Sequence, residues 1–186
     1  MKRSDINRAY RQASAFFKAC GWNVPPEPRW DITDFGIGDY WACGLALVNL
    51  CEEPEYCEKI MYAVANQRTP AHHHRVKKED IICRSGELAV QVWRDDGEPF
   101  AIRVNGQEQQ VANREVINLR GGWRITLEPR VWHEFWGVSD ECLIGEVSTA
   151  NDDASDNYFE SAEVGRFPEI DEDEPAEVRL ISETDG

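Results

Sequence analysis

The stretch TPAHHHRVKKE, residues 69–79, decides what kind of domain this sequence can form. It holds three consecutive histidines, and the whole chain contains only four. In an extended strand alternate side chains point to the same face, so His72 and His74 share one face while His73 points to the other. Glu79 can return along the next strand and add a carboxylate oxygen. The stretch therefore predicts a histidine and carboxylate cluster at the mouth of a β-sheet.

A fourth ligand is offered by His133, which lies in the strand-like run VWHEFW, residues 131–136. Three imidazoles and one carboxylate suit manganese, iron, cobalt, nickel or zinc, and they leave two positions open on an octahedral ion. A structural zinc site would more often use cysteine thiolates. The alternative is a polar histidine loop with incidental metal affinity, because a histidine in a sheet is more often an ordinary hydrogen-bonded residue. The predicted ligands of a divalent metal are His72, His74, Glu79 and His133.

The residues on either side of these two runs predict an all-β fold. From Trp30 to about Ser148, short segments rich in branched and aromatic residues are separated by turn sequences such as Asp95-Asp96-Gly97 and Asn105-Gly106. Within residues 88–93, apolar side chains alternate in the way expected of a strand with one face in a core. Many short strands at this spacing favour a β-sandwich or jelly-roll barrel.

The two ends of the chain differ from this β region. Apolar residues recur every three or four positions from Ser4 to Cys20, which predicts one amphipathic helix with Ser4 as its N-cap and Gly21 as its stop. Three nearby prolines then make an extended linker. We therefore expect a helix and linker over residues 1–29 packed on a barrel of residues 30–168. The acidic residues 169–186 are expected to form a mobile, solvated tail.

Composition excludes several kinds of partner. The chain has 186 residues, with 20 Lys plus Arg against 35 Asp plus Glu, and a net charge of −15 would repel nucleic acid and anionic membrane surfaces. Its first residues lack the apolar run of a signal peptide or membrane span, so we expect a soluble, cytoplasmic protein. The six cysteines show no CxxC pair or disulfide framework, so we expect reduced thiols.

The spacing of the first cluster resembles a known motif. His72-x-His74, four residues, Glu79, six residues and Gly86 fit the first cupin motif, HxH(x)3–4E(x)6G. The motif's leading glycine is replaced by Asn66. The resemblance implies a cupin jelly-roll barrel, here with an N-terminal α-helix and short helical or coil additions.

The second cupin motif is looser, since Pro129 precedes His133 by four residues with no glycine between them. These departures affect turn residues and leave every predicted ligand in place. Cupin barrels commonly pair, so the resemblance also implies a homodimer.

Several short blocks, in order along residues 4–175, resemble the cupin D-lyxose isomerase family. The resemblance implies an enzyme that interconverts D-lyxose with D-xylulose, and often D-mannose with D-fructose, through a cis-enediol. It also implies a divalent metal, typically Mn²⁺, and a small-molecule sugar as the binding partner. The blocks are CEKI (57–60), KEDII (78–82), WHEFW (132–136), GEVS (145–148) and RFP (166–168).

Such an isomerase needs groups that move protons, and four residues are candidates. Lys59 acts near the ion if it faces inward, where burial beside a cation would lower its pKa. Glu146 shares a strand face with Ile144, so a buried carboxylate can act as a base or can orient a metal-binding histidine. Glu160 and Arg166 lie in a segment that can fold back over the barrel mouth, as an acid/base partner and a sugar anchor. Each of the four also fits a surface or structural role.

Three further residues are candidates for substrate binding. Asp156 and Asn157 offer hydrogen bonds to sugar hydroxyls, although both are also common turn residues. Phe135 can stack on a sugar ring, although an aromatic residue in a strand is more often part of the core. Two other functions fit the same ligand set: a non-haem iron dioxygenase, and a module that binds sugar without turnover.

Overall fold

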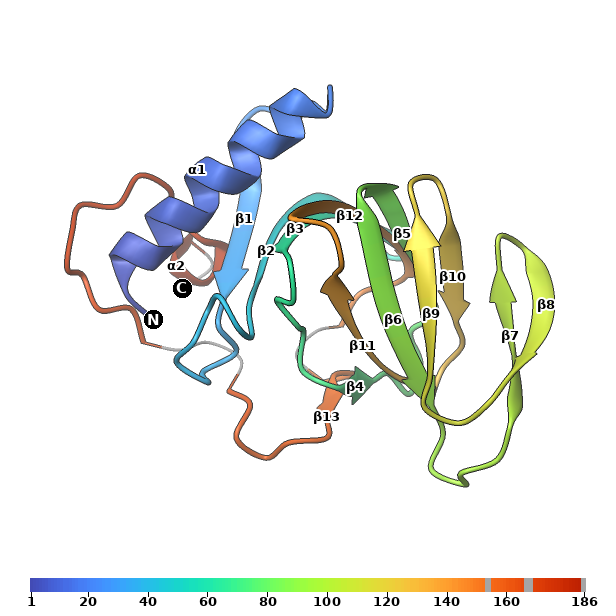
Figure 1. The fold of residues 1–186 in the computed structure, drawn as a ribbon. Coiled ribbons are helices and arrows are strands. Elements are labelled where there is room, and N and C mark those ends of the chain that lie inside the picture. Colours follow the sequence, from blue (N-terminus) through green and yellow to red (C-terminus); the bar gives the residue numbers. More distant parts are fainter. Residues whose placement is uncertain (153–154, 166–168, 185–186) are drawn as a thin grey trace.

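The computed structural model describes residues 1–152, 155–165 and 169–184, which leaves the candidate Arg166 outside the described residues. The chain begins with helix α1 (Arg3–Ala19), and a short helix α2 (Ile181–Thr184) follows the strands (Figure 1). The strands are β1 (Arg29–Thr33), β2 (Leu45–Glu52), β3 (Tyr56–Val64), β4 (His72–His73), β5 (Glu79–Ser85), β6 (Glu87–Trp93), β7 (Phe100–Val104), β8 (Gln107–Val111), β9 (Glu115–Arg120), β10 (Arg124–Leu127), β11 (Trp132–Gly137), β12 (Glu141–Thr149) and β13 (Tyr158–Phe159).

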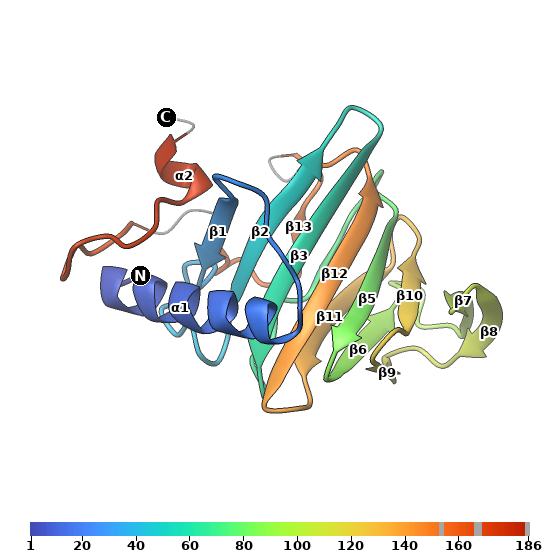
Figure 2. The same ribbon diagram turned by 90° about the horizontal axis from the view of Figure 1, so that it is seen from above.

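The strands form two antiparallel sheets that face each other across one interior. The larger sheet has the order β1-β2-β3-β12-β5-β10-β7-β8, and the smaller has the order β13-β4-β11-β6-β9. Figure 2 shows the strands β2, β3, β12 and β5 side by side, with α1 lying across the β2 and β3 end of this row and β6 and β11 in the layer behind. The predicted all-β cupin jelly-roll barrel with an N-terminal helix is confirmed.

Strands β2 and β3 bury both faces, because one face lines the barrel and the other packs under α1. Leu47 and Met61 belong to the barrel core, whereas Val48 and Ile60 belong to a second core that includes Phe17 of the helix. This arrangement explains why these strands read as continuous apolar runs instead of alternating ones. It also settles the direction of Lys59: on the face of β3 shared with Met61, its side chain points into the barrel, where it is 5% exposed.

The turns that flank the ligand strands use residues with positive φ. Asn66, which replaces the motif's leading glycine, has φ 62°, a conformation that asparagine tolerates better than most residues. Gly86 has φ 85°, and a Cβ there would meet Ser139 and approach the carbonyl oxygen of Glu141 at 2.6 Å, so only glycine fits. Arg130, with φ 67°, donates its N–H to the carbonyl of His74 at 2.6 Å and so links the two motifs.

The end of α1 follows the sequence prediction, but its beginning does not. At the C-terminus Gly21 has φ 72° and donates its N–H to the Lys18 carbonyl, which closes the helix. At the N-terminus the helix already includes Ser4, whose N–H and hydroxyl both donate to the Asp173 carboxylate, at 2.9 and 2.6 Å. The helix is therefore capped by a residue from the far end of the chain.

The described part of the acidic C-terminal segment packs against α1 and is not a free tail. Arg3, whose side chain is 1% exposed, donates to the carboxylates of Glu172 and Glu183, each at 2.6 Å. Leu180 is buried in the core under α1 and forms a parallel bridge with Trp30 of the edge strand β1. The negative charges of this segment thus face a buried cation of the helix, and the expectation of a mobile tail was wrong for residues 169–184.

Two expectations about the chain as a whole can be compared with the structure. Among the described residues, no helix is both long and apolar enough to cross a bilayer. All six cysteines are free thiols, as the sequence predicted.

Replacing Arg3 tests how the C-terminal segment is held. We expect Arg3→Ala to lower the free energy of unfolding by about 2 kcal/mol, because it removes several hydrogen bonds between charged groups. The control is Arg11→Ala, which breaks the exposed pair with Glu177 and should change stability by less than about 0.5 kcal/mol. Urea unfolding measures both values. Equal effects of the two variants would contradict the special role of Arg3.

Acid should release the same segment. The Arg3 guanidinium holds the pKa of Glu183 below its usual 4.5, so this carboxylate stabilises the fold fully above pH 4.5 and loses its contribution as the pH falls through the folded-state pKa. We expect amide exchange in residues 169–184 to rise below pH 4.5 relative to the barrel strands, after correction for intrinsic rates. In Glu183→Gln this pH dependence should shrink. If acid raises amide exchange in Glu183→Gln as much as in the wild type, Glu183 is not the group whose protonation releases the segment.

Candidate active site

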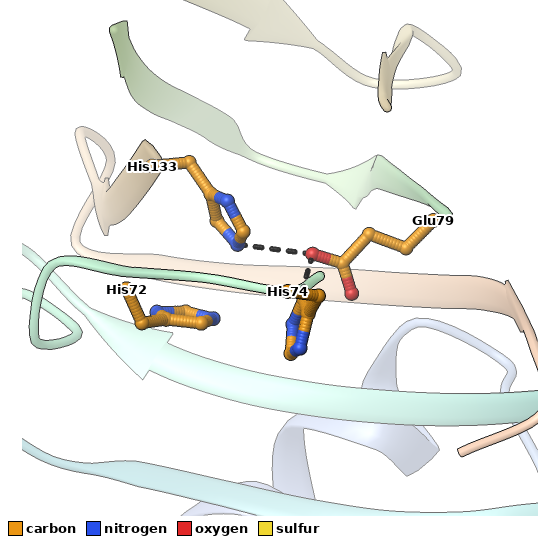
Figure 3. Close-up of side chains that lie close together, drawn as sticks. All are labelled: His72, His74, Glu79 and His133. Atoms are coloured by element: carbon orange, nitrogen blue, oxygen red, sulfur yellow. Dashed lines mark ion pairs between the residues drawn. The ribbon is translucent and has the colours of Figure 1, made fainter. Parts of the chain in front are cut away.

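The four predicted ligands meet at one point inside the barrel. His72 lies in β4 and His74 just beyond it, Glu79 begins β5, and His133 lies in β11 directly opposite His72 in the antiparallel register. One potential ligand atom from each residue lies within 4.8 Å of the others. Figure 3 shows the side chains of His74 and His133 on either side of the Glu79 carboxylate, with the His72 ring beside them. The strand alternation that set His73 aside holds in the structure.

Each imidazole of the cluster is oriented by a backbone carbonyl. The Nδ1 atom of each ring faces a carbonyl oxygen, which can only accept a hydrogen bond, so Nδ1 carries the proton and Nε2 carries the lone pair. This outer hydrogen bond fixes both the tautomer and the ring direction, as is usual for metal-binding histidines. The carbonyls belong to Pro70 for His72, Asp156 for His74 and Val131 for His133, at 2.8, 2.6 and 3.1 Å.

At the centre of the cluster, lone pairs of imidazole nitrogen and carboxylate oxygen atoms face one another with no hydrogen atom between them. The Oε1 atom of Glu79 lies 2.9 Å from Nε2 of His133 and 3.6 Å from Nε2 of His74. These three buried atoms have no hydrogen-bond partner among the described residues. Acceptors that converge in a buried site are unfavourable unless a cation lies among them. The residues present therefore fit a divalent metal ion.

Electrostatics keeps these groups in the forms that bind metals. Burial, and then the nearby ring of His133, lower the pKa of His72 well below 6.5, and burial likewise lowers the pKa of His74. Burial alone would raise the pKa of Glu79, but the ammonium of Lys77 holds it well below 4.5. The imidazoles of His72 and His74 are therefore neutral and the Glu79 carboxylate is ionised near pH 7.

A buried network of charges adjoins the cluster. The Lys77 ammonium lies 2.9 Å from the Glu79 carboxylate and 3.0 Å from that of Glu146. The Lys59 ammonium lies 3.5 Å from the same Glu146 oxygen and donates to Asn151 at 3.1 Å. The side chains of the two lysines and of Glu146 are at most 8% exposed. Lys77 was not among the predicted residues, although its place two positions before Glu79 already put it on the ligand face.

Three ligands of the cluster, His72, His74 and Glu79, line one cavity of about 100 Å³ together with the side chains of Lys59, Lys77 and Glu146. The cavity has room for several water-sized groups. Phe135 forms part of its apolar wall, and Asn157 reaches it with a buried Oδ1 that has no hydrogen-bond partner among the described residues. Asp31 and Thr33 of β1 add polar groups that sequence reasoning missed. The only sequence signal for these two residues would have been their alternation on the inward face of an edge strand.

Two predicted residues lie elsewhere than expected. Glu160 is exposed, pairs with the Arg114 guanidinium at 3.0 Å and does not line the cavity. The Asp156 carboxylate accepts backbone N–H groups of residues 75–77 at 2.8 to 3.2 Å and does not face the cavity. Burial would raise the pKa of Asp156, but these N–H groups hold it below its ordinary value. Asp156 thus supports the ligand loop from behind.

Residues 27–184 match the family model described as D-lyxose isomerase. The chain belongs to the D-lyxose isomerase family. It is 32% identical, over an alignment of 223 positions with gaps, to the D-lyxose/D-mannose isomerase of Escherichia coli O157:H7, with 98% of each chain covered. It is 26% identical to the D-lyxose ketol-isomerase of Cohnella laeviribosi, with 94% of this chain and 100% of that protein covered. The predicted membership in the D-lyxose isomerase family and the predicted aldose–ketose isomerase class are confirmed.

Solved structures with a similar fold include other sugar isomerases. The L-ribose isomerase of Cellulomonas parahominis, solved with L-ribose, superposes with a TM-score of 0.67 at 16% identity and covers 92% of this chain and 98% of its own. The L-ribose isomerase of Geodermatophilus obscurus has the same TM-score and identity over 88% of this chain and 94% of its own. At this identity the likeness shows that this chain shares its barrel fold with these proteins.

Replacing one imidazole tests the cluster as a metal centre. We expect His74→Ala to weaken Mn²⁺ binding by more than about 100-fold, beyond the 10–100-fold typical of losing an outer support. Asp156→Ala, which removes such a support from the ligand loop, should fall in that lower range. Titration of metal-free protein measures both dissociation constants, and far-ultraviolet circular dichroism checks the fold. A folded His74→Ala variant with wild-type affinity would exclude the cluster as the metal site.

Proposed function

We propose that the protein is a metal-dependent isomerase that interconverts D-lyxose with D-xylulose, and D-mannose with D-fructose, through a cis-enediol. The observation that carries the proposal is the convergence of three imidazole lone pairs and a carboxylate in a buried cavity that also holds a network of lysines and Glu146. The sugars come from the names of the family relatives, which are D-lyxose/D-mannose and D-lyxose isomerases.

The proposed ligands of the metal are His72, His74, Glu79 and His133, with Mn²⁺ as the expected ion. Nitrogen and oxygen ligands of this kind also accept Zn²⁺, Fe²⁺, Co²⁺ or Ni²⁺. A divalent ion held there would bind two neighbouring sugar oxygens and stabilise the negative charge that develops on them. The described part of the chain supplies four ligands, which would leave room for both oxygens on an octahedral ion.

Glu146 is the proposed base that takes the proton from carbon two and returns it to carbon one. Its carboxylate lines the cavity and is held between the ammonium groups of Lys59 and Lys77. These two ion pairs fix the position of the carboxylate beside the cavity, where a base must stand. The same ammonium groups can donate hydrogen bonds to the sugar oxygens between which the second proton moves.

The remaining cavity wall is proposed to hold the rest of the sugar. Asn157, with its unpartnered Oδ1, is the proposed hydrogen-bonding group for a hydroxyl, and Phe135 is the proposed apolar surface for a ring or chain face. Asp156 and Glu160 are left out of the reaction because their carboxylates do not reach the cavity. The role predicted for Arg166, a sugar anchor, stays a prediction.

The proposal extends to the state of the protein in the cell. We expect a cytoplasmic enzyme, since the acidic chain suits neither membranes nor nucleic acid. We expect a homodimer, since barrels of this type commonly pair. Light scattering on the purified protein measures its mass in solution.

Isotope exchange tests the reaction and the base together. Mn²⁺-loaded protein incubated without oxygen in D₂O should convert D-lyxose to D-xylulose, with deuterium appearing at the exchanged carbon by NMR. Glu146→Gln should lower kcat by about 10²- to 10⁴-fold, the range of general base catalysis, while Mn²⁺ binding is retained. The matched control is Glu58→Gln on the outer face of β3, where Glu58 opposes Val147.

Two results would overturn the proposal. A dioxygenase would be identified by oxygen consumption with an enediol or thiol substrate, together with no deuterium exchange when oxygen is absent. Sugar binding without any turnover would identify a binding module.

A further inference from the structure

His73 is the one residue of the histidine triplet that does not face the cluster, and its ring is held on the outer face of the smaller sheet. It stacks on Tyr158, with ring centroids 5.1 Å apart and planes 16° apart, and meets the edge of Trp132 at 4.3 Å. Its Nδ1 atom has no hydrogen-bond partner among the described residues. The contacts that hold the ring are therefore packing contacts of its face and edge.

These contacts belong to a continuous row, here named the outer aromatic stack. Trp132 stacks on Trp93 with planes 7° apart, and a guanidinium covers each end of the row, Arg75 over Tyr158 at 4.1 Å and Arg114 over Trp93 at 4.4 Å. The aromatic members come from four neighbouring strands, β6, β11, β4 and β13. In order, the stack is Arg114, Trp93, Trp132, His73, Tyr158 and Arg75.

The residues next to these outer rings in the same strands point to the inner face, where the predicted metal ligands lie. In β4 His72 points inward and His73 outward, and in β11 His133 points inward and Trp132 outward. In β13 Phe159 lines the cavity beside His72, at 5.7 Å between centroids, while Tyr158 points outward. Each strand thus offers one inner ring to the cavity and one outer ring to the stack.

The strand ladder that holds this region is short, although the Arg130 N–H also donates to the His74 carbonyl and the Thr69 N–H to that of Phe135. β4 and β13 are only two residues long, and β4 is paired with β11 at the single position His72 to His133. A slip of one residue would turn His73 into the cavity and both neighbouring histidines out of it, because strand side chains alternate with period two. Side-chain packing on the outer face adds to the few backbone hydrogen bonds in favouring the observed register.

We propose that His73 is a positioning residue for the metal site. Through the outer aromatic stack it fixes the register of β4, so that His72 and His74 meet Glu79 and His133 before an ion binds. This inference rests on the proposed metal-dependent function and deepens it, because it assigns ligand placement to the face opposite the ligands. It predicts that an aromatic ring at position 73 matters and that an imidazole does not.

The test compares His73→Ala with His73→Phe. His73→Ala should weaken Mn²⁺ binding by about 10- to 100-fold, the range for residues that orient metal ligands, and His73→Phe should restore it to near the wild-type value. Trp123→Ala is the control, because it removes an exposed aromatic side chain outside the stack. Thermal unfolding of the metal-free proteins measures their stability. It shows whether His73→Ala loses Mn²⁺ affinity without a matching loss of stability.

A second readout uses metal-free protein and does not depend on function. Amide exchange in residues 72–77 should be faster in His73→Ala than in the wild type, and His73→Phe should reverse the change. Unchanged Mn²⁺ affinity in His73→Ala would overturn the inference, as would an equal loss in both variants. If the wild type binds no divalent ion, the proposed function fails; exchange rates then still decide whether the stack orders the ligand loop.

Discussion

The interaction on which the rest of this structure depends is the buried approach of imidazole lone pairs to the Glu79 carboxylate. Without a cation these acceptors repel, and the fold must hold them together by other means. It does so in layers: backbone carbonyls fix each ring, the Asp156 carboxylate fixes the loop that follows His74, and Lys77 offsets the charge of Glu79. Each support comes from a residue outside the ligand set.

The barrel serves this purpose because its strands near the cavity are used on both faces. β2 and β3 send one set of side chains into the interior and the other under α1, so the helix seals the wall that carries Lys59. The C-terminal segment in turn holds α1 through Arg3 and covers the edge strand β1 at Trp30. A segment from the far end of the chain thus supports the helix that seals the wall carrying Lys59.

Strand periodicity explains which parts of the site were predictable from the sequence. The side to which His72, His74 and Glu146 point was predictable because side chains alternate along an extended segment, which each residue's own neighbours reveal. Glu79 was linked to the histidines by its spacing in the sequence alone. The direction in which Asp156 points could not be predicted, because the backbone N–H groups that donate to its carboxylate lie about 80 residues away in the chain. The acidic segment was misjudged for a similar reason, since nothing local shows that Arg3 is buried and needs anions.

The charges around the cavity argue for a role of the ion in chemistry over a role as a structural clamp. With the lysines protonated, the ammonium groups of Lys59 and Lys77 balance the carboxylates of Glu79 and Glu146. Three of the four proposed ligands are neutral imidazoles, so a divalent ion would leave an excess of positive charge in the cavity even with the Asp31 carboxylate counted. Fixed positive charge of this kind favours an anion that forms during a reaction, because no solvent must reorganise. An enediolate is such an anion, whereas a closed thiolate site would have neutralised its metal and left no such excess.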